Sequence, residues 1–400
     1  MASSDKRPIT ALVFALGIAQ IISWGSFYYT IGVVGTAMQR DLGISSAMLF
    51  GAFTFSLLMS GLVAPAVGRL IDEWGGRRIL SAGSIIACVA LLLMAGSQGP
   101  VTLLIGSGAC GIAMSLCLYD ATFVTLNQVT GERYRTAVTA VTLFGGFAST
   151  AFWPLSHWLL ELIGWRWTLL LYAGLQIGVC LPLHALILPR RAREPALQTG
   201  IATNTAKKFP PAYGSRYNTL AAAFALGSFV LSALSIHIIG LLKDSGMTTG
   251  EAVLVATLIG PMQFLVRVLE FAFARHIGPI GVGAASFLFM ATATVLLYFV
   301  EGYSPMAFIA VAIYGFSNGI MTIVRGTVPG VLFGYEAYGS LLGRLARPAF
   351  LARALAPFAF SAVLTMGLMR GDAILLLTGF SIVAGIGYLQ ATMARRSASA

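Results

Sequence analysis

Five ionisable residues stand inside long apolar stretches of the chain, where a charge is costly. They are Asp120, Arg267, Glu270, Arg325 and Arg353. In an apolar segment that spans a bilayer, a charge at the centre costs at least about 2.5–3.5 kcal/mol, so it normally faces a partner or a wet cavity. Arginine binds anions, and a carboxylate pairs with arginine or exchanges a proton. These five residues therefore predict an internal polar site.

Two interpretations of this site stay open. In the first, the five residues form ion pairs that break and reform as a gate. We favour this for Asp120, which could pair with Arg325 or Arg353. In the second, one or two arginines bind an anionic substrate. Glu270 follows Arg267 by three residues on one helix face, so it could simply neutralise that arginine.

The stretch "SWGSFYYTIG" adds an aromatic group near the middle of the first apolar run. Trp24, Tyr28 and Tyr29 recur at helical spacing there. Tyrosine hydroxyls could hydrogen-bond a substrate carboxylate. Packing between helices is the alternative explanation for the same three rings.

The cysteines and histidines predict no metal site and no catalytic centre. All four cysteines lie in apolar runs, so no disulfide framework is expected. Cys110 and Cys117 are seven residues apart on one helix face, and thiolates are ligands that arsenic(III) favours. Cysteine is also an ordinary small apolar residue in a membrane. Without metal spacing, a phosphate-binding loop or a catalytic constellation, we expect no cofactor, no ATP-driven step and no enzyme.

The elements that carry these residues are long apolar segments. The chain has 400 residues, of which 58% are hydrophobic and 10% charged, and this composition is typical of a protein that crosses the membrane many times. A spanning helix needs about 20 mostly apolar residues. Twelve such runs are predicted, near 9–38, 46–70, 79–97, 101–129, 136–161, 167–188, 217–242, 250–274, 277–300, 305–332, 348–369 and 373–393.

The distribution of Lys and Arg predicts the orientation. With the N-terminus inside, 18 of the 25 basic residues fall on the inner side, four on the outer side and three within spans. The positive-inside rule then places both termini in the cytoplasm. It also accounts for the net charge of +11 without a nucleic-acid partner. The polar segment 189–216 is expected to be a cytoplasmic linker between two bundles, 1–188 and 217–400.

The densest charged stretch, "GRLIDEWGGRR" at 68–78, lies between the second and third runs. Asp72 ends the second run, where its carboxylate could accept hydrogen bonds from the first amides of a neighbouring helix. The stretch "VRVLE" at 266–270 is similar to "GRLID", because it carries an Arg and an acid at the same place in the second half. This repeat favours duplication of a six-helix unit.

These features resemble the major facilitator superfamily over essentially the whole chain. The loop signature of that family, Gly-x-x-x-Asp-x-x-Gly-Arg-Arg/Lys, falls on Gly68, Asp72, Gly75, Arg77 and Arg78, with one extra glycine. The resemblance implies an all-α membrane protein with twelve transmembrane helices in two pseudo-symmetric six-helix bundles. It also implies that Asp72 latches onto the start of span 11. Arg77 and Arg78 could instead serve only as topology determinants.

The stretch from Phe50 to Leu80 resembles the monocarboxylate and oxalate/formate branch. In that branch, cationic residues on spans 8 and 11 bind the substrate, and Arg267 and Arg353 are the nearest matches. A related bacterial branch exports trivalent arsenicals. Two features of proton-driven drug exporters are missing: their span-4 arginine, which Ser107 replaces, and a Gly-Pro pair in span 5.

We therefore expect a monomeric secondary transporter of the bacterial inner membrane that works by rocker-switch alternating access. Its substrate would be a small organic anion resembling a monocarboxylate, with proton coupling through Asp120 or Glu270. Substrate binding is assigned to Arg267, Arg353, Trp24, Tyr28 and Tyr29. Gating and coupling are assigned to Asp120, Arg325, Glu270, Gly68, Asp72, Arg77 and Arg78. The alternative is efflux of trivalent arsenicals, antimonials or another small toxic solute.

Overall fold

The computed structural model describes residues 9–189, 214–273, 276–365 and 369–393, and within these ranges the regular structure is helical. In the first half the helices are α1 (Ile9–Trp24), α2 (Ile31–Leu42), α3 (Ser46–Trp74), α4 (Gly76–Ala95), α5 (Pro100–Cys117), α6 (Tyr119–Thr130), α7 (Tyr134–Gly146) and α8 (Ala148–Leu175). Short π-helical or 3-10 segments lie at Gly25–Tyr29, Gly131–Arg133, Gln176–Cys180 and Leu183–Ile187. In the second half they are α9 (Gly214–Lys243), α10 (Thr249–Ala256), α11 (Ile259–Phe273), α12 (Pro279–Tyr298), α13 (Pro305–Phe333), α14 (Tyr338–Thr365) and α15 (Arg370–Met393).

Ten continuous helical stretches of the described chain are long and apolar enough to cross a membrane. One of them, Pro100–Ile187, has 88 residues and contains two turns between spans. The first is the 3-10 turn Gly131–Arg133, and the second is at Gly164, whose φ of 77° is left-handed. This stretch therefore contains three spans, and the total is the predicted twelve.

Local signals at the helix ends agree with the sequence. Ser45 accepts a hydrogen bond from the Met48 amide at the start of α3, and Thr248 forms a capping box with Glu251 at the start of α10. Pro100 is the first residue of α5, where its missing N–H costs nothing. Gly75, with φ 84°, makes the tight turn between α3 and α4.

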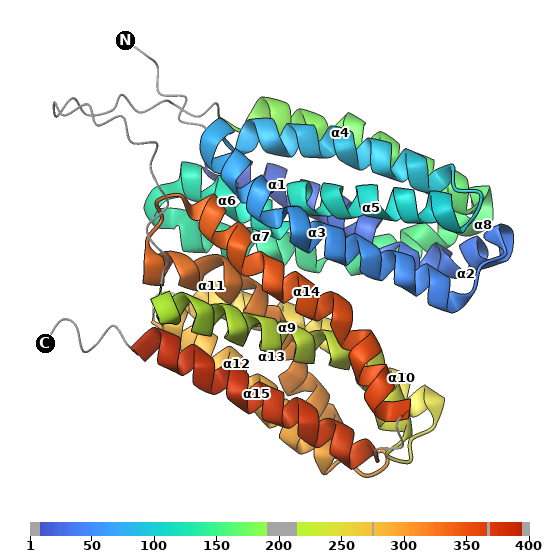
Figure 1. Cartoon of the computed structure of the whole chain (residues 1–400), viewed down its shortest axis with the longest axis vertical. Coiled ribbons are helices and arrows are strands. Elements are labelled where there is room, and N and C mark those ends of the chain that lie inside the picture. The colour runs from blue at the N-terminus through green and yellow to red at the C-terminus, as the bar shows by residue number, and fades with distance from the viewer. Residues whose placement is uncertain (1–8, 190–213, 274–275, 366–368, 394–400) are drawn as a thin grey trace, which may run out of the picture.

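The helices form two bundles, one from each half of the chain (Figure 1). The bundles meet mainly where α3 packs along α14 and α7 packs along α11. In Figure 1, α3 and α14 run side by side near the end of the molecule where α15 ends, and they diverge toward the opposite end. Most of the expected linker 189–216 lies outside the described residues, so the domain boundaries stay a prediction.

The two bundles share one detail of their internal packing. Arg166 in the sixth span donates to the carbonyl of Ala95 at the end of the third. Arg370, at the corresponding place in the second half, donates to the carbonyl of Leu297 at the end of the ninth span, at 2.7 Å. Each arginine thus satisfies a carbonyl in the last turn of a helix in its own bundle.

Candidate functional site

Asp72 lies at the contact between the two bundles. Its Oδ1 accepts a hydrogen bond from the Gly339 amide at 2.8 Å, and its Oδ2 accepts one from the Ser340 amide at 2.7 Å. Both amides belong to the first turn of α14, where N–H groups lack partners within the helix and the dipole favours a negative charge. This is the contact with the start of span 11 that the sequence predicts.

The other residues of the predicted loop signature lie in different surroundings, and only Gly68 contacts the partner helix. Gly68 packs so closely on α14 that an added Cβ would overlap the Gly339 carbonyl. Arg77 reaches the Leu188 carbonyl at 3.5 Å, within its own bundle, and Arg78 is exposed. Gln128 accepts from the Gly76 amide and donates to the Ile71 carbonyl, so it fixes the turn between α3 and α4.

Glu270 makes the matching contact from the other half. Its Oε1 accepts hydrogen bonds from Nε and Nη2 of Arg135 at 2.9 and 2.8 Å, and its Oε2 accepts one from the Thr139 hydroxyl at 2.6 Å. Arg135 also donates to the Ile277 carbonyl. Glu270 thus pairs across the bundles with α7 rather than with Arg267 on its own helix. The sequence analysis treated Arg135 only as a cytoplasmic charge and missed this role.

Two tyrosines that the sequence analysis did not single out meet between these contacts. The hydroxyls of Tyr134 and Tyr338 both donate to the Gly326 carbonyl of α13, and their rings pack edge to face with centroids 5.8 Å apart. Each tyrosine is the first residue of its helix, α7 or α14, and the two helices occupy corresponding places in the two halves. Only the internal repeat could have pointed to the pair.

The predicted pair of Asp120 and Arg325 forms between α6 and α13. The Asp120 Oδ1 lies 3.7 Å from the Arg325 Nη2, an ion-pair distance longer than a hydrogen bond. The Arg325 guanidinium also lies over the ring of Phe350, and Arg353 lies over the same ring. The two arginines are therefore neighbours, and only Arg325 forms an ion pair with Asp120.

Arg267 is buried deep between the bundles, with 5% of its surface exposed. Its Nη1 donates to the Thr142 carbonyl of α7 at 3.1 Å, and its Nε donates to the Gly319 carbonyl of α13 at 3.3 Å. Among the described residues, no ion pair involves Arg267 or Arg353. This leaves two guanidinium groups in a membrane interior without a matching carboxylate.

The predicted aromatic group faces this charged centre. Trp24 lies 5.4 Å from Tyr28 and 5.1 Å from Tyr119 between ring centroids, and Tyr28 lies 5.5 Å from Tyr29. Tyr29 and Tyr119 lie within electrostatic range of Arg267. The chain bends into a π-helical turn at Gly25–Tyr29, which places both neighbouring tyrosines in the cluster.

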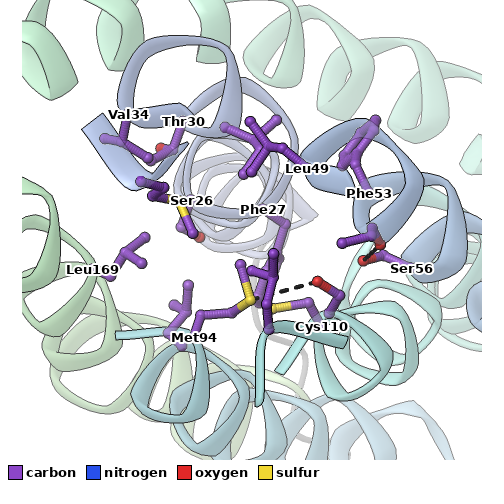
Figure 2. Close-up of a pocket in the computed structure, with 16 residues that line it drawn as sticks. Ser26, Phe27, Thr30, Val34, Leu49, Phe53, Ser56, Met94, Cys110 and Leu169 are labelled. Atoms are coloured by element: carbon purple, nitrogen blue, oxygen red, sulfur yellow. Dashed lines mark hydrogen bonds between the residues drawn. The ribbon is translucent and has the colours of Figure 1, made fainter. Parts of the chain in front are cut away.

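A separate small pocket of about 30 Å³ lies inside the first bundle. Figure 2 shows Cys110 and Met94 at one side of it, with Ser26, Thr30 and Leu49 around the rest. None of the residues assigned to substrate binding lines this pocket. Cys117 instead lies near Cys180, so the two cysteines that we considered as thiol ligands lie in different surroundings.

Twelve spans in two bundles, closed at one end by polar contacts around buried charges, define a multi-pass membrane transporter. The chain belongs to the Major Facilitator Superfamily, whose family model matches residues 16–357.

Its relatives include transporters of several kinds. The chain is 29% identical over 171 residues to the multidrug transporter protein MdtP of Bacillus subtilis, covering 42% of this chain and 30% of that protein. It is 23% identical over 214 residues to monocarboxylate transporter 6 of Mus musculus, covering 51% and 45%. Less than half of each relative is therefore matched. A 38 kDa protein encoded in the 23S RNA operon of Thermoproteus tenax is 26% identical, with 96% of both chains covered.

Solved structures agree on the fold. The human organic anion transporter MFSD10 (TETRAN) superposes with a TM-score of 0.70 at 17% identity, covering 96% of this chain and 100% of that one. A bacterial homologue of the iron transporter ferroportin, in an outward-facing state, gives 0.72 at 16% identity, covering 96% and 99%. At these identities the likeness concerns the fold alone.

Proposed function

We propose that the chain is a secondary transporter of a small organic anion resembling a monocarboxylate. The observation that carries the proposal is the excess of positive charge between the bundles. Arg325 pairs with Asp120, whereas among the described residues no ion pair involves Arg267 or Arg353. A charge buried in a membrane is stable only with a partner, and an anionic substrate would supply the missing negative charge.

The aromatic group completes the proposed binding site. Tyr28 and Tyr29 would donate hydrogen bonds to the substrate carboxylate, while Trp24 would pack against its apolar part. One relative supports an anion by its name, monocarboxylate transporter 6 of Mus musculus.

Rocker-switch alternating access is the proposed mechanism. The contacts of Asp72, Glu270 and Tyr134 close one end of the molecule, which the positive-inside rule assigns to the cytoplasm. The state described here would therefore face outward. We further propose a monomer in a bacterial inner membrane, with both termini in the cytoplasm.

Proton coupling is proposed at Asp120 rather than at Glu270. Both oxygens of Glu270 accept hydrogen bonds, whereas Asp120 is about a quarter exposed and sits 3.7 Å from its arginine. A loosely paired carboxylate next to the binding site can exchange its proton as the substrate arrives. The substitution Asp120→Asn should remove the stimulation of uptake by a pH gradient but leave counterflow of substrate intact.

Uptake into proteoliposomes tests the substrate class. Purified protein should take up labelled pyruvate or lactate, and Arg267→Gln should lower the rate about tenfold or more, because a charge-assisted hydrogen bond is lost. Arg40→Gln is the matched control, since Arg40 is exposed at the opposite end of the bundle, and it should transport like the parent. Absence of carboxylate uptake by the parent protein would refute the anion proposal.

Export of a small toxic solute is the second candidate, favoured by the similarity to the multidrug transporter of Bacillus subtilis. Within this candidate, export of trivalent arsenicals has less support, because Cys110 and Cys117 do not share one pocket. A thermal-shift comparison of carboxylates, arsenite and amphiphilic drugs separates the candidates, since only a bound solute raises the unfolding temperature.

A further inference from the structure

A groove of about 460 Å³ runs along the membrane surface of the second bundle, between α9 and α15. The residues that line the groove include three small ones, Ala222, Ala223 and Gly387, whose short side chains leave its space open. At Gly387 a Cβ would lie only 3.6 Å from the Ala223 Cβ, so the two helices pack closely at the floor. On the α9 side the groove extends from residue 218 to 226, about 12 Å along the helix.

The groove is set apart from the transport site. Its lining residues belong to two helices of one bundle, and none is assigned to substrate or gating. Both helices are spans, and Asn218, Val383 and Ile386 are exposed. In a bilayer, the molecules that reach such a surface are lipids. A length of about 12 Å is most of the roughly 15 Å thickness of one leaflet's hydrocarbon.

The end of the groove that carries the chain termini is polar and basic. Asn218 and Gln390 form its rim. Two residues before Asn218, Arg216 donates from Nε to the Ala391 carbonyl at 2.6 Å and so links α9 to α15. Arg216 is partly exposed, and among the described residues no ion pair involves it.

We propose that this groove binds one anionic phospholipid, with an acyl chain between α9 and α15 and the phosphate on the Arg216 guanidinium. A phosphodiester can approach the exposed part of the guanidinium, and its charge neutralises an arginine at the edge of the membrane. The amides of Asn218 and Gln390 can donate to the headgroup. The proposal goes beyond transport and does not depend on the substrate.

Native mass spectrometry of the purified full chain tests the proposal. The parent protein, titrated with phosphatidylglycerol and with phosphatidylcholine of the same acyl chains, should retain one phosphatidylglycerol preferentially. Arg216→Gln should reduce that retention about fivefold or more and leave phosphatidylcholine unchanged, whereas Arg216→Lys should keep most of it. Arg40→Gln is the matched control and should behave like the parent.

Two further arms identify the occupant. Ala222→Trp fills the groove wall and should reduce retention of the lipid while the unfolding temperature stays near that of the parent. Soluble glycerol 3-phosphate should not compete, because it lacks the acyl chain. Retention of phosphatidylglycerol by Arg216→Gln at the parent level, or equal retention of phosphatidylcholine by the parent, would overturn the proposal. Competition by glycerol 3-phosphate would overturn it in favour of a free phosphate ion.

Discussion

Asp72 and Glu270 occupy corresponding places in the two halves, yet they close the same end of the molecule by different chemistry. Asp72 accepts hydrogen bonds from two backbone amides of α14. Glu270 accepts hydrogen bonds from the side chains of Arg135 and Thr139 on α7. The first contact depends on the approach of two backbones, and the second on one ion pair that is largely hidden from solvent.

The substitution Glu270→Gln should weaken this closure. It leaves the Arg135 guanidinium without a charged acceptor at a site where the carboxylate side chain is only 2% exposed. Breaking one partner of a buried pair costs several kcal/mol, and the partial exposure of Arg135 reduces this to about 1–3 kcal/mol. The unfolding temperature in detergent should fall, and Glu132→Gln, an exposed carboxylate at the same end, should leave it unchanged.

The substitution Asp72→Asn should act on opening more than on folding. An asparagine side chain can accept from only one of the two backbone amides and lacks the charge that the start of α14 favours, so we expect a loss of about 1–2 kcal/mol. In a background without the native cysteines, Ala346→Cys reports on this contact, because Ala346 is buried against Ala64 of α3. Asp72→Asn should speed its modification by a maleimide, and an unchanged rate would contradict the latch.

At the scale of elements, the pairing of α3 with α14 rests on glycines on both helices. A Cβ at Gly61 would lie 2.8 Å from the Phe350 Cβ, and those at Gly68, Gly339 and Gly343 would overlap backbone atoms of the partner helix. Glycine at these positions permits the close approach of two helix backbones, which packing between membrane helices requires. Because backbone atoms cannot move aside like a side chain, this contact tolerates no added methyl group.

Gly68→Ala should therefore destabilise the closed end by about 1–3 kcal/mol through overpacking. Gly51→Ala on the same helix is the matched control, because a Cβ there meets nothing within 4 Å. That control should be neutral or slightly stabilising, since alanine is the better helix former. The reporter Ala346→Cys should react faster in Gly68→Ala and at the parent rate in Gly51→Ala. Equal rates in both variants would show that the close approach does not govern closure.

At the scale of the whole molecule, the contacts between the bundles described here gather at the end from which the chain termini emerge. They include the Asp72 and Glu270 contacts and the two tyrosines on Gly326. Toward the other end α3 and α14 diverge (Figure 1). A molecule locked at one end is suited to release that lock as the other end closes, which is the motion that alternating access requires.

The orientation of this closed end can be measured directly. In a cysteine-free background, Glu132→Cys lies exposed at the closed end and Gln98→Cys lies exposed at the opposite end. An impermeant maleimide should label Gln98→Cys in intact cells and Glu132→Cys only in inverted vesicles. Labelling of Glu132→Cys from outside would reverse the assignment and turn the proposed outward-facing state into an inward-facing one.

The amino-acid sequence alone determined the number of spans, although α14 begins at Tyr338, ten residues before the predicted start near 348. A bilayer forces each spanning segment to satisfy its own backbone hydrogen bonds, so long apolar runs can only be helices there. The family resemblance of the loop signature implied that Asp72 contacts the start of span 11. The cost of burying a charge alone predicted that Asp120 pairs with an arginine, and it left Arg325 and Arg353 as alternatives.

Only the tertiary structure decided which charges meet and which stay without a partner. Nothing in the local sequence distinguishes Arg135, which pairs with Glu270, from any other basic residue near the membrane edge. The same holds for Tyr134 and Tyr338, which acquire their role by meeting at Gly326. Helical spacing predicted that Glu270 could neutralise Arg267. Because α11 packs against α7, Glu270 pairs with Arg135 instead. The reason is physical: a helix specifies its own faces, and the neighbour that covers each face is chosen when the bundles dock.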